Sequence, residues 1–114
     1  MQRFYKILFF VFLVLLVSCS SEKKKQAPTV LLSETEMVDV LTDVQIMEAA
    51  IGYLKNINQP TEYLKTIGYD TVFSHYGITD SIFKVNMVYY YDHEPLTLIR
   101  IYDSVESRLA RMKN

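Results

Sequence analysis

Residues 33–54 read SETEMVDVLTDVQIMEAAIGYL, and this stretch decides the fold class of the chain. Ser33 followed by Glu36 is a capping box, in which each side chain can bond the backbone N–H of the other at the start of a helix. Apolar residues then recur in steps of four and three, which places them along one face of a helix: Val40, Val44, Met47, Ile51 and Leu54. The pattern predicts a helix that begins after Ser33 and ends at the NINQP sequence of residues 56–60.

A second helix is predicted from Thr61 to Tyr76, where the apolar spacing is less regular. Gly68 lies in its middle, and a glycine there is less favourable for helix formation than alanine by about 1 kcal/mol. Gly68 is therefore a candidate break in this helix. Gly77 follows the predicted helix and suits its C-terminal cap.

A third helix is predicted after Thr79, whose hydroxyl can cap it, with Asp80 in the first turn where the helix dipole favours an acid. The apolar run from Val85 to Tyr91 also suits a buried strand. We favour the helix because the sequence holds no second strand-like run, and a lone strand would leave its backbone groups unpaired.

A fourth helix is predicted to begin at Pro95, a residue that suits the first helical position. Its apolar residues again step by four, three, four and three: Leu98, Tyr102, Val105, Leu109 and Met112. The predicted fold class is therefore all-α, a small bundle of about four helices in residues 31–114, behind a signal peptide and a flexible tether.

Residues 1–18 are predicted to be a secretory signal peptide. Arg3 and Lys6 precede an apolar run from Ile7 to Val17, and the small Ser18 follows it. Because a membrane span needs roughly 20 apolar residues, an uncleaved N-terminal anchor is the less favoured alternative.

Cys19 is the single cysteine of the chain, and the order Leu16-Val17-Ser18-Cys19 fits a bacterial lipobox. Resemblance to bacterial lipoproteins implies cleavage before Cys19 and its acylation, and two or more acyl chains would hold the protein at a membrane. The alternative is a chance cysteine after an ordinary signal peptide. Residues 19–30 are polar, include a run of lysines and are predicted to form a lipidated, flexible tether.

The net charge of the predicted domain argues against a nucleic-acid partner. After Lys25 the chain holds seven basic and twelve acidic residues, so the domain is mildly acidic. It lacks the basic stripe that nucleic-acid binding needs, and we expect no nucleic-acid partner.

A loose pattern of residues is spread along the predicted domain: Leu41, Asp43, Glu48, Ala49, Tyr76-Gly77-Ile78, Phe83, Tyr90-Tyr91, Pro95, Ile101-Tyr102-Asp103, Val105 and Leu109. With this pattern, residues 28–112 resemble a family of short lipoproteins of Bacteroidota-type bacteria, the domain of unknown function 4296. Asn86 stands where the family pattern has a serine, which puts any role of that hydroxyl in doubt. The family carries no assigned activity, so the resemblance implies a cell-envelope address and a fold.

The residues after Cys19 bear on which side of the membrane the domain faces. In lipoproteins of these bacteria, an acid-rich stretch after the lipidated cysteine commonly marks surface export. Here Glu22 is followed by Lys23 to Lys25, which reverse the charge. We therefore expect a protein anchored to the inner or outer membrane of the cell envelope, with the periplasmic side favoured.

Paired acids are the first polar candidates for a site. Asp39 and Asp43 lie four residues apart on one helix face and could bind a divalent cation with a third ligand. A solvated helix face is favoured, because like charges at this spacing are only mildly destabilising. Glu48 lies beside the apolar stripe, and we expect it to bond a partner such as Arg100 or a tyrosine hydroxyl.

The histidines give no catalytic or metal-binding pattern. Asp92, His93 and Glu94 are adjacent in sequence, whereas zinc sites use spaced ligands. Ser74 and His75 would point about 100° apart on a helix, which excludes a nucleophile–base pair between them. We predict no catalytic residue, no metal and no cofactor, and hence a protein that is not an enzyme.

Tyr89, Tyr90 and Tyr91 are the candidate interface, because three consecutive helical residues cover about 200° of the circumference and cannot all face one core. Packing at the core edge is the alternative. We predict a protein-binding or assembly module with an unknown envelope protein as partner. A small chaperone-like module or apolar-ligand carrier is the alternative function, with a groove of adaptable methionines that core filling also explains: Met37, Met47, Met87 and Met112.

Overall fold

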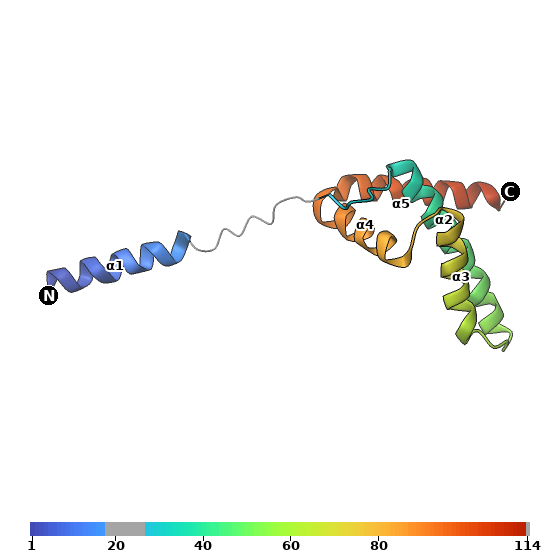
Figure 1. Ribbon diagram of the computed structural model, residues 1–114, viewed down its shortest axis with the longest axis horizontal. Helices are drawn as coiled ribbons and strands as arrows, with labels where there is room; N and C mark the ends of the chain where they lie inside the picture. The colour runs from blue at the N-terminus through green and yellow to red at the C-terminus, as the bar shows by residue number, and fades with distance from the viewer. Residues whose placement is uncertain (18–26, 114) are drawn as a thin grey trace.

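The computed structural model describes residues 1–17 and 27–113, and within them it contains five α-helices and no strand (Figure 1). The prediction of an all-α fold is confirmed. Four helices follow residue 31, as expected from the apolar spacing. The bounds of the five are α1 Gln2–Val17, α2 Glu34–Asn56, α3 Glu62–His75, α4 Asp80–His93 and α5 Pro95–Met112.

Helix α1 covers most of the predicted signal peptide. Its described side chains, up to Val14, are exposed. Across the described ranges, none of the helices combines the length and the apolar character needed to cross a bilayer. Cys19 and residues 20–26 of the predicted tether lie outside the described residues, so lipidation stays a prediction.

Helix α2 begins with the predicted capping box. The Glu36 backbone N–H donates to Ser33 Oγ at 3.1 Å, and the Ser33 backbone N–H donates to Glu36 Oε2 at 2.8 Å. The buried side chains of α2 all lie in its N-terminal half: Met37, Val38, Val40, Leu41, Thr42 and Val44.

The predicted apolar stripe of α2 is therefore buried over only part of its length. Ile51 and Leu54 are half-buried, although they continue the same spacing. The reason is the arrangement of the neighbouring helices. The N-terminal half of α2 packs against α5, where Arg108 reaches Asp39, while α3 lies alongside its C-terminal part (Figure 1).

Gly68 does not break α3, so the candidate break is wrong, and the helix runs through it from Glu62 to His75. The glycine permits a close approach instead. A Cβ at Gly68 would lie 2.7 Å from Met47 Sδ of α2, which is closer than atoms pack. Gly68 therefore leaves room for the Met47 side chain at the contact between α2 and α3.

Alanine should stabilise the two helical glycine positions unequally. Gly52 has open space around its missing Cβ, so Gly52→Ala should raise the free energy of unfolding by about 1 kcal/mol. Gly68→Ala should raise it by less, because the methyl group must displace the flexible end of the Met47 side chain. Urea denaturation of both variants measures the difference, and equal stabilisation by the two substitutions would contradict the packing role of Gly68.

The core lies where α4, α5 and the end of α3 meet the N-terminal half of α2. Phe73 of α3 is buried and stacks on Phe83 of α4, with 5.0 Å between ring centroids. Ile101 and Val105 of α5 are fully buried one turn apart. Helix α4 forms across the run for which a strand was the alternative. The buried apolar residues are Leu32, Met37, Val38, Val40, Leu41, Val44, Phe73, Ile78, Tyr90, Ile101 and Val105.

An extended segment before α2, residues 30–32, is bonded along α4, and we call it the strap. Asn86 of α4 is fully buried, and both the oxygen and the nitrogen of its side-chain amide bond the strap. The backbone N–H of Leu32 donates to Asn86 Oδ1 at 2.8 Å, and Asn86 Nδ2 donates to the Val30 carbonyl at 2.8 Å. The Tyr90 hydroxyl donates to the Leu32 carbonyl at 2.5 Å. The strap is thus part of the folded domain.

Candidate interaction surface

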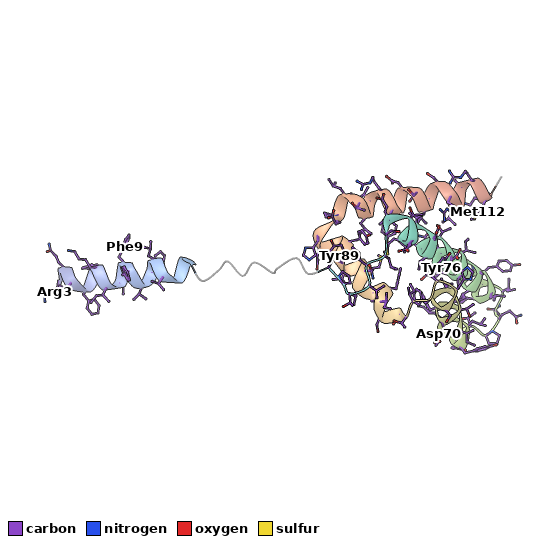
Figure 2. All side chains as sticks on the ribbon, turned by 45° about the horizontal axis from the view of Figure 1, so that its top comes forward. Arg3, Phe9, Asp70, Tyr76, Tyr89 and Met112 are labelled. Carbon is purple, nitrogen blue, oxygen red and sulfur yellow. The ribbon has the colours of Figure 1, made fainter. Side chains whose placement is uncertain are left out.

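The structure places the three consecutive tyrosines in three environments. Tyr90 is 6% exposed and belongs to the core. Tyr89 is half-buried and lies edge-on to Tyr90, with ring centroids 5.5 Å apart, close to the turn into α5 (Figure 2). Tyr91 is 73% exposed. Of the candidate interface residues, Tyr91 is therefore the one whose ring is free to contact a partner.

Tyr91 lies at one side of an apolar hollow between α4 and α5. Pro95 begins α5 directly after the turn, and the spacing of three and four residues then brings the next apolar side chains to the same face of that helix. Ile99 is 57% exposed, so this face is not covered by the rest of the described chain. The hollow has a volume of about 470 Å³, and we call it the α4–α5 groove, lined by Tyr91, Pro95, Leu98, Ile99 and Tyr102.

The charges of this part of the surface are mostly negative. Between Tyr89 and Ser107, the acidic residues Asp92, Glu94, Asp103 and Glu106 are exposed. The basic residue in the same stretch, Arg100, is paired with Glu34 of α2 at 3.2 Å. The groove thus lies in a stretch of chain whose unneutralised charges are acidic.

Two tyrosine hydroxyls bond carboxylates between α2 and α3. Tyr69 donates to Glu48 Oε1, so the expected partner of Glu48 is a tyrosine hydroxyl, while Arg100 lies elsewhere. Tyr76 donates to Asp43 Oδ2 at 2.5 Å. The hydrogen bond to Glu48 is the main cause that raises the pKa of Tyr69 to about 12. Burial, followed by the bond to Asp43, raises the pKa of Tyr76 to about 12.

These two tyrosines predict a loss of stability at high pH. Because their folded pKa of about 12 exceeds the ordinary value of 10.0, the folded state holds these protons more tightly. Their contribution is complete below pH 10 and should be lost as the pH rises toward 12. Urea denaturation of wild type and of Tyr69→Phe with Tyr76→Phe measures it.

The double variant should lose part of this pH dependence, while Tyr53→Phe, which changes a tyrosine that is 65% exposed, should keep it. A double variant whose free energy of unfolding falls with pH as steeply as that of wild type would contradict the assignment.

The acidic pair of α2 is engaged by other helices. Arg108 of α5 donates to Asp39 Oδ1 at 2.6 Å, and Asp43 accepts from Tyr76. The favoured expectation of a solvated face is therefore wrong: both carboxylates hold neighbouring helices to α2. In the described residues, no three His, Cys, Asp or Glu side chains gather as metal ligands would.

The histidines and methionines are not gathered into one site. The His75 ring meets the Tyr76 ring edge-on, and His93 lies near Tyr89, with ring centroids 5.0 and 5.4 Å apart. Met37 is fully buried in the core, and Met47 packs against Gly68. Met87 is half-buried, while Met112 lies exposed at the far end of α5 (Figure 2).

Sequence reasoning missed the structural role of Asn86. It gave this residue no partner, yet the side chain is fully buried and bonds the strap. A signal was present, because Asn86 lies three residues after Phe83 and four before Tyr90, on the face of α4 that points to the core. A polar side chain on such a face is expected to form hydrogen bonds with the backbone, because buried polar groups are bonded.

The fold and this surface define a small all-α domain with an exposed apolar groove and acidic surroundings. The chain belongs to the family described as Domain of unknown function (DUF4296), whose model matches residues 28–114. A search of curated proteins and a search of solved structures each gave no match.

Proposed function

We propose that this protein is a lipid-anchored component of the bacterial cell envelope that binds a partner protein and catalyses no reaction. The observation that carries the binding role is the α4–α5 groove, where Tyr91 and Ile99 are exposed beside a formed core. Apolar residues that gather on an exposed face mark interaction sites, and tyrosine is enriched among residues that dominate binding energy.

The N-terminal sequence supports the anchoring. The basic start, the apolar run and the Leu16-to-Cys19 box occur in the order of a lipoprotein signal, which favours cleavage after Ser18 and acylation of Cys19. Lys23 to Lys25 favour a domain that faces the periplasm from the inner or outer membrane. The strap begins at Val30, the last residue of the predicted tether, so the domain would stay near the membrane surface.

A photo-crosslinking residue at position 99 tests the binding role in intact cells that make the full chain. Ile99 should give discrete crosslinked products. A crosslinker at Glu62, which is exposed at the start of α3, should not give the same products and serves as control. Crosslinks that are absent at both positions, or identical at both, would argue against the groove as a binding site.

Tyr91→Ala should weaken binding of the crosslinked partner by about 2 kcal/mol, because an exposed aromatic anchor is lost. Its melting temperature should change little, since Tyr91 is 73% exposed. Tyr90→Ala is the matched contrast: it removes a core ring and should melt early. Early melting of Tyr91→Ala without selective loss of the partner would assign Tyr91 to packing.

The alternative function is a carrier of small apolar ligands. It is favoured by a hollow of about 440 Å³ between α3 and α4, which is lined in part by Tyr69, Phe73 and Phe83. Lys84 at this hollow is paired with Asp80 at 2.8 Å, so the aromatic rings are what would hold an apolar ligand. Partner crosslinks that depend on Tyr91 favour the binding module over the carrier.

A further inference from the structure

We infer that the α4–α5 groove receives a cationic amphipathic segment of a partner protein, with apolar side chains in the groove and Lys or Arg beside it. The inference rests on the proposed binding function and specifies the chemistry of the partner. We infer the apolar side chains of the partner segment from the lining of the groove, in which each residue is apolar or aromatic.

The charge of the partner follows from the acids near the groove. Glu106 lies four residues after Tyr102, so it continues the groove-lining face of α5 by about one turn. Asp92 follows Tyr91 directly, and both acids are exposed. Arg100 does not offset them, since it is engaged by Glu34 of α2. A segment with basic residues on either side of its apolar ones would therefore match this surface in charge.

The same charges disfavour two other occupants. A second copy of the chain, docked groove to groove about a two-fold axis, would bring Glu106 and Asp92 of each copy toward those of the other. An anionic bilayer would repel the acids, because the attraction of such membranes is for basic segments. A basic protein segment is the occupant for which both the apolar lining and the charges are favourable.

The absence of tryptophan from the sequence allows a direct test on the full chain held in phosphatidylcholine vesicles. Tyr91→Trp places a single reporter in the groove. The probe is a short peptide of leucine and lysine at helical spacing, and the matched probe replaces each lysine by glutamate. The leucine–lysine peptide should shift the emission to shorter wavelength. Tyr53→Trp, on an exposed part of α2, should not respond, and empty vesicles correct for binding to lipid.

Charge variants complete the test in the Tyr91→Trp background. Asp92→Asn with Glu106→Gln should weaken the peptide by about fivefold and reduce its dependence on salt. Glu62→Gln with Asp70→Asn removes the same charge from exposed positions of α3 and is the matched control. The control variant should bind as tightly as the parent.

Three results would overturn the inference. The first is that the glutamate peptide binds as well as the lysine peptide. The second is that both charge variants weaken binding equally. The third is that brominated lipids quench Tyr91→Trp without peptide, which would assign the groove to the membrane. If crosslinks at Ile99 persist in cells while the lysine peptide does not bind, the binding function stands and the cationic partner does not.

Discussion

Asn86→Ala is expected to lower the free energy of unfolding by about 2–4 kcal/mol. The substitution leaves the Leu32 N–H and the Val30 carbonyl without their partner, and an unpaired buried group costs about 1–3 kcal/mol. It also removes atoms from a fully buried site. Urea denaturation measures the loss, and hydrogen exchange should show faster exchange of the Leu32 amide.

Two further variants separate the bonds of the strap. Tyr90→Phe removes only the hydroxyl that donates to the Leu32 carbonyl, so it should cost about 1 kcal/mol. Asn86→Asp keeps an acceptor for the Leu32 N–H but loses the donor to Val30. Its stability at neutral pH should fall at least as far as that of Asn86→Ala, because a carboxylate would be buried against the Val30 and Ile82 carbonyl oxygens. An unchanged Leu32 exchange rate in Asn86→Ala would show that the strap is held by other means.

Cys19→Ser should release the protein from the membrane fraction. Each buried methylene of an acyl chain contributes about 0.8 kcal/mol, so loss of two or three chains removes nearly all membrane affinity. Fractionation of cells and metabolic labelling with a clickable palmitate analogue are the measurements. Label should disappear from the variant. Ser21→Ala, two residues after Cys19, is the matched control and should be labelled like wild type.

If Cys19→Ser were labelled as strongly as wild type, the lipoprotein proposal would be abandoned. If label were lost but the protein stayed with the membrane, α1 would be the retained anchor. The two measurements together therefore distinguish lipid attachment from an uncleaved signal sequence.

The helices were predictable because their signals are local. The capping box of Ser33 and Glu36 and the cap of Thr79 both form as the sequence indicates. Pro95 lies in the first turn of α5, and Ile101 and Val105 face the core with the spacing expected of one helix face. These features depend on neighbours within one or two turns of the chain.

The surface was less predictable because burial depends on distant helices. Periodicity alone does not tell that Val44 is buried while Ile51 stays half-buried. Nor does it tell which of three adjacent tyrosines faces outward. Gly68 was an apparent weakness of α3 until Met47 of α2 was placed against it. Such features are properties of pairs of helices, and a single segment does not contain them.

The pairing of α2 with α5 would also affect how the chain folds if it is exported as proposed. Arg100 meets Glu34 and Arg108 meets Asp39 across 66 and 69 residues of sequence. Contacts of this range form late, because the intervening chain must first be closed into a loop. If the chain crossed a membrane starting from its N-terminal side, α2 would reach the far side before α5. The pairing of α2 with α5 would then form only after α5 had crossed, so the core would be completed late in translocation.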